Sequence, residues 1–404
     1  MVTKTDFLVI GGGIIGISVA RELIKTFPDT KITLIEKEND CGLHASGRNS
    51  GVLHAGFYYT GDSLKARFTK DGNKALTNYC EEKKIKINKC GKLVVAKNEN
   101  DLLLLDELLK RGKTNGVSLN KVSEEEAKCI EPRAKTYQRA LFSPTTSTVS
   151  PQEVLKAMKH DALSEGVKIL SGIKYVKRVK NNILTSDGIF DAGYIINAAG
   201  LYADVIAHDF GFSKQYKILP FKGLYLYSNE PIGSIRTNIY PVPDLRNPFL
   251  GVHFTITVDG NVKIGPTAIP AFWREQYNFF DNFNLFEFVD IVNREIDLFM
   301  FSKFDFKKLA IEEIQKYSKL KMVQLAFMLA SDVQEKHYKT WGRSGIRAQL
   351  VNLKEKKLEM DFVIEGNEKS LHILNAVSPG FTCAIPFAKH VCDKINNLLK
   401  GVKN

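Results

Sequence analysis

The sequence predicts an α/β protein whose N-terminal part is a β-α-β unit of a parallel sheet. An apolar run at residues 7–10 is followed directly by a glycine-rich turn, and then by a helical apolar pattern through Val19, Leu23 and Ile24. A second apolar run, residues 32–35, follows this helix. A strand, a turn, a helix and a second strand in this order are typical of a doubly wound parallel sheet with helices on its faces.

The glycine-rich turn carries the spacing G-x-G-x-x-G. Gly11, Gly13 and Gly16 occupy its three glycine positions, and Glu36 lies 20 positions beyond the last of them, at the end of the second strand. The first glycine permits a tight turn, the second lets the backbone approach a pyrophosphate, and the third lets helix and strand pack closely. We therefore predict one dinucleotide site. A second such motif and a C-x-x-C pair are both missing from the sequence, which disfavours a reductase that binds FAD and NADPH together.

Length and composition narrow the class of protein. The chain has 404 residues, of which 44% are hydrophobic and 25% charged, so it is globular and long enough for roughly two to three domains. Six cysteines without metal-type spacing predict reduced thiols, no metal site and a cytoplasmic location. No apolar run reaches the length of about 18 residues that a membrane-spanning helix needs. Peripheral attachment to the inner face of the cytoplasmic membrane stays open, as does the oligomeric state.

The net charge of +12 is compatible with nucleic acid, an anionic membrane surface or an acidic substrate. Lysines occur as scattered short pairs with acidic neighbours, as at residues 81–84. A nucleic-acid footprint would be clustered, so we expect no nucleic-acid partner.

The middle of the chain alternates between helical and extended patterns. We expect helices at about 101–115 and 151–165, the second with Ser150 as its cap and Pro151 at its first position. Strands are expected at 168–179, 183–190 and 194–200. The segment 272–306 is rich in aromatic residues, and we interpret it as a helical cap whose aromatics belong to the core, with a lipid or quinone surface as the alternative.

Residues 46–59 resemble the signature of the L-2-hydroxyglutarate dehydrogenases and oxidases, which are FAD enzymes of the D-amino-acid-oxidase fold. Further blocks similar to that family follow in its order, at residues 90–95, 197–202, 220–223, 238–244, 248–255, 345–349 and 378–379. The resemblance covers nearly the whole chain. It implies an α/β fold with a Rossmann-like FAD-binding domain of the glutathione-reductase type and an inserted α+β substrate domain on a mixed or antiparallel sheet.

The domain boundaries that we expect are discontinuous. The FAD-binding domain takes residues 1–82, 145–218 and 338–404, and the substrate-binding domain takes residues 83–144 and 219–337.

The resemblance makes FAD the expected cofactor. The positions expected to bind it come from the glycine-rich turn, the end of the second strand, the 48–51 segment, two later strands and the 378–382 segment. They are Gly11, Gly13, Ile14, Ile15, Gly16, Glu36, Lys37, Arg48, Asn49, Ser50, Gly51, Val176, Ala198, Gly200, Ser378, Pro379, Gly380, Phe381 and Thr382. Arg48, Asn49 and Ser50 are assigned to the diphosphate, and 378–382 would offer N–H groups to the isoalloxazine.

Oxidation of a 2-hydroxy acid needs a base for the hydroxyl proton. Imidazole has a suitable pKa, and both candidate histidines lie in the family-like blocks. We assign the base to His253. For His54 three roles stay open: orienting the flavin, attaching it covalently, or acting as the base itself.

The same reaction needs a cation to hold the substrate carboxylate. The planar fork of arginine matches the two carboxylate oxygens, so Arg347 and Arg274 are the candidates. Lys222 and Tyr58 are the candidate second contacts.

The predicted function is oxidation of L-2-hydroxyglutarate, or a close 2-hydroxy acid, to the 2-oxo acid, with hydride passing to flavin N5 and electrons then to quinone or oxygen. The partners expected are a small acidic substrate and, as an open choice, a quinone or membrane surface. The alternatives are an amino-acid or amine oxidase of the same fold, a flavoprotein acting on RNA, and an FAD-binding module without activity.

Overall fold

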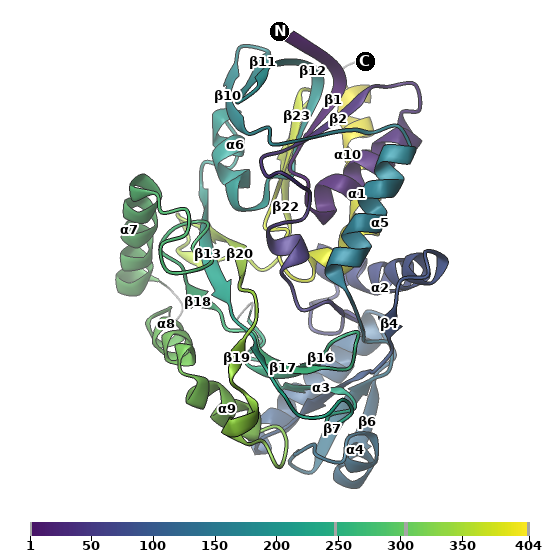
Figure 1. Cartoon of the computed structure of the whole chain (residues 1–404), viewed down its shortest axis with the longest axis vertical. Helices are drawn as coiled ribbons and strands as arrows, with labels where there is room; N and C mark the ends of the chain where they lie inside the picture. Colours follow the sequence, from purple (N-terminus) through teal and green to yellow (C-terminus); the bar gives the residue numbers. More distant parts are fainter. Residues whose placement is uncertain (1, 246–248, 303–305, 402–404) are drawn as a thin grey trace.

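The structure is a computed structural model that describes residues 2–245, 249–302 and 306–401. Pro248 of the family-like block, Phe304 of the aromatic segment, and residues 1 and 402–404 of the predicted FAD-binding domain lie outside the described residues. Figure 1 shows β1, β2, β12 and β23 at one end of the molecule and β6, β7, β16 and β17 at the other.

The first sheet contains the predicted parallel unit. Its strands are, in spatial order, β10 (Tyr175–Val179), β11 (Asn182–Thr185), β12 (Gly188–Asn197), β1 (Val2–Ile10), β2 (Ile32–Glu36) and β9 (Lys168–Ser171), with β23 (Ser370–Leu374) beside β12 and β22 (Val363–Gly366) beside β23. β1 pairs in parallel with β2 and β12, and β12 pairs in parallel with β23. The sheet is therefore doubly wound, as predicted.

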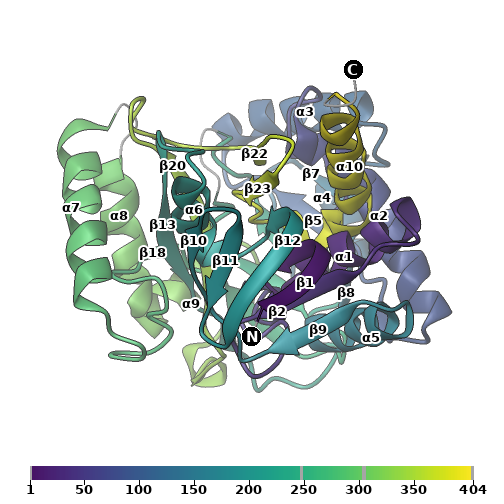
Figure 2. The ribbon, with the colours of Figure 1, turned by 90° about the horizontal axis from the view of Figure 1, so that it is seen from above.

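Helices cover both faces of this sheet, so β2, β23 and the C-terminal halves of β1 and β12 are buried. One face packs against α1 (Ile14–Thr26), α2 (Leu64–Glu82), α5 (Pro151–Ser164) and α10 (Gly380–Lys400). The other face packs against α6 (Ala203–Asp209) (Figure 2). Helix α5 starts as predicted, because Ser150 Oγ accepts the N–H of Glu153 and Pro151 takes the first position.

Two predicted strands are each divided in the structure. The predicted strand 168–179 is β9 and β10, which are separated at Gly172, where φ is +77°. β9 pairs in parallel with β2, whereas β10 pairs with β11 in a hairpin. The predicted strand 183–190 is likewise split by a turn between β11 and β12, and β12 continues through the predicted strand 194–200 as far as Asn197.

The second large sheet combines two distant segments of the chain. Its strands are, in order, β19 (Thr340–Trp341), β14 (Leu226–Tyr227), β17 (Val262–Gly265), β16 (His253–Ile256), β15 (Asn238–Pro241), β5 (Lys92–Val95), β7 (Arg139–Ser143) and β6 (Asn120–Ser123). β5 and β15 are parallel, and the other neighbours are antiparallel. The expected mixed sheet is therefore present.

Two smaller sheets and the remaining helices complete the fold. The small sheets are β18 (Ile269–Pro270), β13 (Tyr216–Gly223), β20 (Gly345–Asn352) and β21 (Lys357–Leu358), and β3 (Val52–Leu53), β8 (Ser147–Val149) and β4 (Ile87–Asn88). The helices are α3 (Glu99–Thr114), α4 (Glu124–Ile130), α7 (Leu285–Phe301), α8 (Phe306–Ile314) and α9 (Lys319–Phe327). Because β13 and β20 pair across the predicted boundaries, the domain limits stay a prediction.

The aromatic segment does not pack as predicted. Trp273 and Tyr277 are buried, but Phe279 and Phe286 are 87% and 86% exposed. Exposed apolar side chains extend over α7, α8 and α9, which lie along one side of the molecule in Figures 1 and 2. We call these side chains the apolar face. It comprises Phe272, Phe279, Phe280, Phe283, Leu285, Phe286, Val289, Ile296, Phe299, Met300, Phe301, Ile311, Ile314, Tyr317, Leu320, Phe327 and Met328.

The inward sides of these helices explain the difference. Ile291, Leu298, Phe306 and Leu309 pack into a core with β13, β18 and β20. The helices are thus apolar on the inner and the outer side, which a periodicity argument cannot separate. Within the described ranges, every helix is too short or too polar to cross a membrane.

Candidate active site

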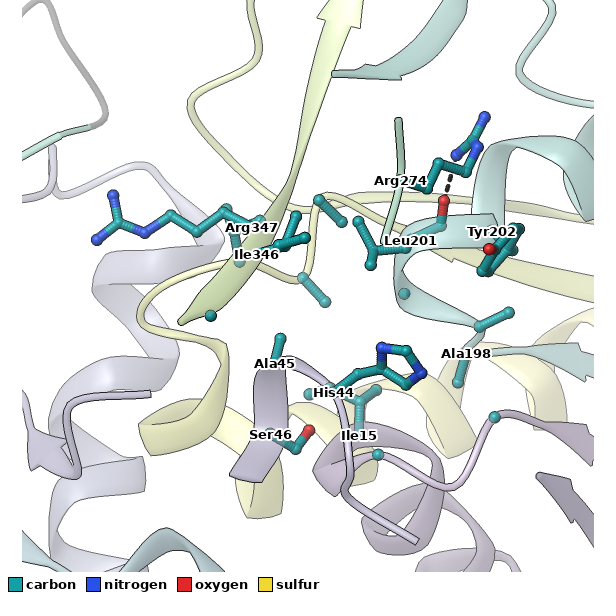
Figure 3. A pocket seen from close by; sticks show the side chains of 18 of the residues that line it. Ile15, His44, Ala45, Ser46, Ala198, Leu201, Tyr202, Arg274, Ile346 and Arg347 are labelled. Carbon is teal, nitrogen blue, oxygen red and sulfur yellow. Dashed lines mark hydrogen bonds between the residues drawn. The ribbon is translucent and has the colours of Figure 1, made fainter. Parts of the chain in front are cut away.

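A cleft of about 690 Å³ opens where the parallel strands of the first sheet end. Ile10, Glu36, Ala198 and Asn375 line it, directly at or after the ends of β1, β2, β12 and β23. Figure 3 shows Ala45 and Ser46 on one side of this pocket and Ile346 and Arg347 on the other. The carboxyl edge of a doubly wound sheet is where such folds bind dinucleotides.

The glycine-rich turn has the close approaches that its spacing predicts. Gly11 has φ +112°, and a Cβ atom there would lie 2.4 Å from the Ala198 carbonyl oxygen. A Cβ at Gly16 would lie 1.9 Å from the Gly11 carbonyl oxygen. Because neither position tolerates a side chain, the start of α1 lies close against the strand ends. Its free N–H groups and its positive dipole end therefore point to the cleft, which fits an anionic diphosphate.

The carboxylate of Glu36 is buried at the edge of the cleft. Its two oxygens accept the N–H of Gly12 at 2.7 Å and the N–H of Glu38 at 2.9 Å. These bonds fix the carboxylate, which leaves further lone pairs for ribose hydroxyls. The turn, the helix start and Glu36 together fit FAD.

All the predicted cofactor positions line this cleft except Gly16, Gly51 and Gly380. Gly16 serves the packing of α1 on the strands, and Gly380 is the first residue of α10. Gly51 has φ +78° and lies against the Val149 carbonyl oxygen, so it shapes the loop before β3.

Arg48 and Asn49 order the loop that carries them. Arg48 donates from Nε to the Leu43 carbonyl at 2.7 Å, and its guanidinium carbon lies 4.2 Å from the ring centre of Tyr277. Asn49 donates to the Ser46 carbonyl at 2.6 Å. Both residues line the cleft, and their role at the diphosphate stays a prediction.

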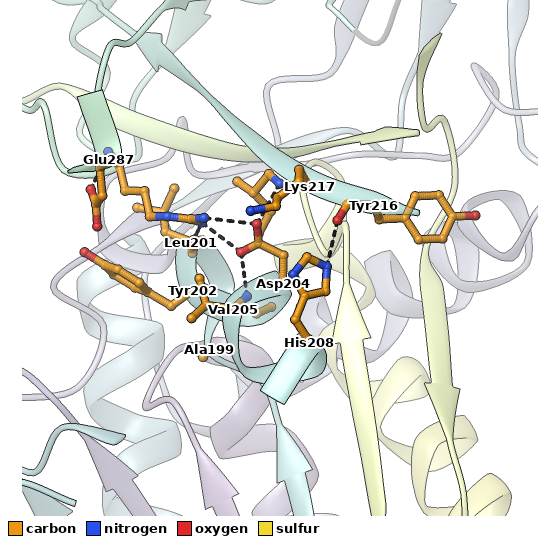
Figure 4. Close-up of polar contacts among 12 residues, drawn as sticks. Ala199, Leu201, Tyr202, Asp204, Val205, His208, Tyr216, Lys217 and Glu287 are labelled. Carbon is orange, nitrogen blue, oxygen red and sulfur yellow. Dashed lines mark hydrogen bonds and ion pairs between the residues drawn. The ribbon is translucent and has the colours of Figure 1, made fainter. Parts of the chain in front are cut away.

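The expectation that Arg274 holds a substrate carboxylate is corrected by its contacts. Arg274 is 3% exposed, and its guanidinium pairs with both oxygens of Asp204, at 2.8 and 3.0 Å. It also donates to the Leu201 carbonyl (Figure 3). Figure 4 shows Asp204 at the start of α6, where it also accepts the N–H of Val205. A buried arginine requires such a partner, so its charge is already compensated.

The ion pair between Arg274 and Asp204 keeps the Asp204 carboxylate ionised. Burial alone would raise the pKa of Asp204, but the charge and the hydrogen bonds of Arg274 hold it below the ordinary value. Asp204 therefore stays ionised, and Arg274 links the 272–284 segment to α6.

A second, smaller cavity of about 40 Å³ adjoins the cleft. It is lined by Ser50, His54, Tyr225, Tyr240, Phe249, Leu250, His253, Pro266, Arg347, Gln349, Val377 and Ser378. Seven of these residues, including His54 and Arg347, also line the large cleft. The structure thus brings three predicted catalytic residues together at the border of the cofactor cleft: His253 from β16, His54 after β3, and Arg347 from β20.

His253 is held in one orientation. Its Nδ1 lies 2.9 Å from the Gly251 carbonyl oxygen, and its ring stacks on Tyr240 with 3.6 Å between ring centres and an interplanar angle of 19°. A carbonyl only accepts, so Nδ1 carries the proton and Nε2 of the neutral ring keeps a free lone pair. Burial lowers the pKa of His253 well below its ordinary value, which keeps the ring neutral.

His54 is also buried and neutral. Burial first, and then the charges of Lys92 and Arg347, lower its pKa to about 3. Its Nδ1 has no hydrogen-bond partner among the residues that the structure describes. Its backbone N–H donates to Thr382 Oγ1 at 3.2 Å, which connects it to the start of α10.

Arg347 is a cation without a carboxylate partner in the described part of the chain. Its guanidinium carbon lies 5.4 Å from the ring centre of Phe249, and of the residues that the structure describes it is the only lysine or arginine that lines the small cavity. Arg347 and Arg274 lie on opposite sides of the pocket in Figure 3. Of the two predicted anchors, only Arg347 is placed to bind an anion beside the histidines.

Lys222 and Tyr58 line neither cavity. Lys222 is buried on β13, and Tyr58 lies behind the small cavity in a cluster with Tyr240. Sequence reasoning missed Tyr240, which holds His253, although Tyr240 lies within the family-like block 238–244.

The chain is similar to known FAD-dependent enzymes. Residues 6–394 match the family model described as FAD dependent oxidoreductase. The L-2-hydroxyglutarate dehydrogenase of Escherichia coli is 34% identical over 412 residues, which are 99% of this chain and 95% of that protein. The mitochondrial L-2-hydroxyglutarate dehydrogenase of Nematostella vectensis is 36% identical over 425 residues, or 96% and 90% of the two chains. The chain belongs to the L-2-hydroxyglutarate dehydrogenase family.

Membership of this family confirms the predicted class of enzyme, an FAD-dependent oxidoreductase. Solved structures agree on the fold. The dithionite-reduced L-alpha-glycerophosphate oxidase of Mycoplasma pneumoniae with FAD bound has a TM-score of 0.76 at 22% identity, covering 98% of this chain and 95% of that chain. Glycine oxidase from Geobacillus kaustophilus has a TM-score of 0.73 at 18% identity with the same coverage. The predicted D-amino-acid-oxidase fold and FAD as cofactor are thus confirmed.

Proposed function

We propose that the protein oxidises L-2-hydroxyglutarate to 2-oxoglutarate. The observation that carries this proposal is the small cavity at the edge of the FAD cleft. It is lined by both His253, whose Nδ1 is held by the Gly251 carbonyl, and Arg347, which has no carboxylate partner among the described residues. A base and a cation in one buried place are what the oxidation of a 2-hydroxy acid requires. Relatives named for this activity cover almost the whole chain.

Each residue has one task in this reaction. Arg347 holds the C1 carboxylate with two parallel hydrogen bonds and thereby aims C2. His253 accepts the hydroxyl proton at Nε2 while the C2–O bond becomes a carbonyl. Bound FAD supplies the acceptor for the hydride that leaves C2 with its electron pair. His54, which lines both cavities, is the second candidate for the base.

Anaerobic mixing of the purified holoenzyme with substrates tests this proposal. We expect L-2-hydroxyglutarate to bleach the flavin absorbance and the D enantiomer to leave it unchanged. Bleaching by an amino acid, with no response to either hydroxy acid, would instead establish an amino-acid oxidase. His253→Gln should slow the reduction by roughly 10²–10⁴-fold, the usual contribution of a general base. If His54→Gln shows that loss and His253→Gln does not, the base is His54.

We further propose that the electrons leave to a quinone at a membrane surface, on the inner face of the cytoplasmic membrane. The apolar face supports this proposal, since contiguous exposed apolar patches on soluble monomers rarely exceed a few hundred Å². Phe286 belongs to the apolar face and also lines the FAD cleft, so the face begins at the mouth of the cofactor site. The net charge of +12 favours an anionic surface.

Cosedimentation with vesicles tests this surface. We expect binding to vesicles with anionic lipid, and its loss in the double variant Phe279→Ser/Phe301→Ser. Leu103→Ser is the matched control, because Leu103 is 75% exposed on α3, outside the apolar face. Turnover should be faster with a short-chain quinone than with oxygen. A dimer that buries the face, or equal turnover with oxygen, would overturn the proposal.

A further inference from the structure

Lys92 is a lysine with an unusual environment directly behind the small cavity. It is the first residue of β5 and has no exposed surface. Its Nζ has no hydrogen-bond partner within the described ranges. Three aromatic rings surround it, with the ring centres of Phe57, Tyr58 and Tyr240 at 4.8, 4.6 and 4.7 Å from Nζ.

The three aromatic rings around Lys92 stabilise a charged amine without neutralising it. The faces of aromatic rings attract an ammonium group, most strongly where water is excluded. Burial works in the other direction and lowers the pKa of Lys92 to about 7. In the part of the chain that the structure describes, no carboxylate forms an ion pair with it. A buried charge without a counter-ion is costly, so its retention calls for an explanation beyond packing.

The second large sheet places Tyr240 between Lys92 and His253. Strand β15 lies between β5 and β16, and its Tyr240 therefore stands between the two side chains. The ring of Tyr240 contacts the ammonium of Lys92 and also stacks on His253. The three residues form a cation, ring and imidazole in a row that ends at the small cavity.

The charges around His253 all act in one direction. After burial, its ring is influenced by Lys92 from β5, by His54 from the segment after β3, and by Arg347 from β20. Each of these positive or potentially positive groups disfavours the imidazolium form. The Gly251 carbonyl alone opposes them. Lys92 and Arg347 also act on His54.

We propose that Lys92 is a positioning residue of the reaction, whose ammonium keeps His253 in the neutral form that can accept the substrate proton and, through Tyr240, holds its ring in place. Arg347 does not suffice for this task, because the substrate carboxylate neutralises it on binding. The charge of Lys92 is shielded from the substrate by the rings, so it persists in the complex. This inference rests on the proposed function, since it takes His253 as the base.

The pH dependence of the Lys92→Met holoenzyme tests the inference. Methionine has a similar shape without the charge, and replacing a buried charge by an apolar group is often tolerated by the fold. We expect kcat for L-2-hydroxyglutarate, whose pH dependence reports the enzyme–substrate complex, to acquire an acidic limb. Along this limb kcat should fall about tenfold for each pH unit below the apparent pKa of the base. In the wild type the same quantity should stay nearly flat down to about pH 5.5, because burial and the charge of Lys92 keep the base neutral.

Lys65→Met is the matched control. Lys65 is also buried, and its Nζ lies 6.0 and 5.7 Å from the ring centres of Tyr59 and Phe362, but it faces the carboxylate of Asp361. Its removal should leave the pH dependence unchanged. Lys92→Arg retains the charge and should retain the flat profile.

Three outcomes separate the proposals. An acidic limb in Lys92→Met that is missing from Lys65→Met and Lys92→Arg supports the inference. A Lys92→Met profile parallel to the wild type, at whatever activity, overturns it. If Lys92→Met does not accumulate, Lys92→Gln is measured with the same criteria. If L-2-hydroxyglutarate fails to reduce the wild-type flavin, the proposed function fails by itself, before any variant is compared.

Discussion

Replacing Arg347 by methionine should nearly abolish the oxidation of L-2-hydroxyglutarate. Among the described residues, the lining of the small cavity has no other lysine or arginine, so no other cation of that lining can take over the carboxylate. Two charge-assisted hydrogen bonds contribute about 1.5–3 kcal/mol each, and their loss corresponds to about 3–6 kcal/mol in the complex. That free energy converts to a decrease of roughly 10²–10⁴-fold in kcat/KM. Arg347→Lys keeps the charge but loses the planar fork, so its decrease should be smaller.

The assay is the anaerobic reduction of the flavin under single-turnover conditions, with the substrate concentration varied. It separates the binding of the substrate from the rate of hydride loss. Arg343→Met is the matched control, because Arg343 is exposed just before β20 and lies outside both cavities. A value of kcat/KM for Arg347→Met within about tenfold of the wild type would refute the reasoning, since less than one charge-assisted hydrogen bond would then be lost.

Two further predictions concern the cofactor and the stability of the fold. Gly11→Ala should yield protein without FAD, because the new Cβ would lie 2.4 Å from the Ala198 carbonyl oxygen at a φ of +112°; the ratio of flavin to protein absorbance measures this. Gly166→Ala is the control, because Gly166 has a similar φ of +99° but no atom within 4 Å of the new Cβ, so this variant should keep its flavin. Full flavin content in Gly11→Ala would contradict the prediction. Burial lowers the pKa of His54 to about 3 and that of His372 to about 4, from an ordinary value of 6.5. Between pH 6.5 and these values, the unfolded chain therefore binds more protons than the folded chain. The free energy of unfolding should therefore be highest above pH 6.5 and fall by about 1.4 kcal/mol per pH unit for each histidine as the pH decreases. Urea unfolding at several pH values measures it, and a constant free energy would show that these histidines are not held neutral.

The dinucleotide-binding unit was predictable from the sequence because its determinants are local. Gly11, Gly16 and Glu36 act within one β-α-β unit, and each has a steric or hydrogen-bonding reason that depends on near neighbours. The cap of α5 at Ser150 is local in the same sense. Such features follow from spacing alone.

Arg274 shows why other predictions failed. Its role depends on Asp204, a residue 70 positions earlier in the chain, and nothing in the sequence around Arg274 indicates that pairing. The aromatic segment failed for a related reason. Whether Phe279 is covered depends on what packs against the segment, and apolar composition is the same for a core and for an exposed surface.

Tyr240 and Lys92 were overlooked for topological reasons. The parallel pairing of β5 with β15 joins residues 92–95 to residues 238–241, and this pairing places Lys92, Tyr240 and His253 on adjacent strands. A parallel pair between distant segments has no turn signal to reveal it. The family-like blocks contained both residues, but a block does not say which side chains meet.

The closing helix α10 has a consequence for the synthesis of the enzyme. The cleft takes its walls from residues 10–54 near the start of the chain and from residues 373–382 near its end, and α10 packs against α1 and α2. A growing polypeptide therefore lacks one side of its flavin site until residues 373–382 have left the ribosome. A premature stop codon before residue 373 would remove this wall, and we expect such a chain not to retain FAD.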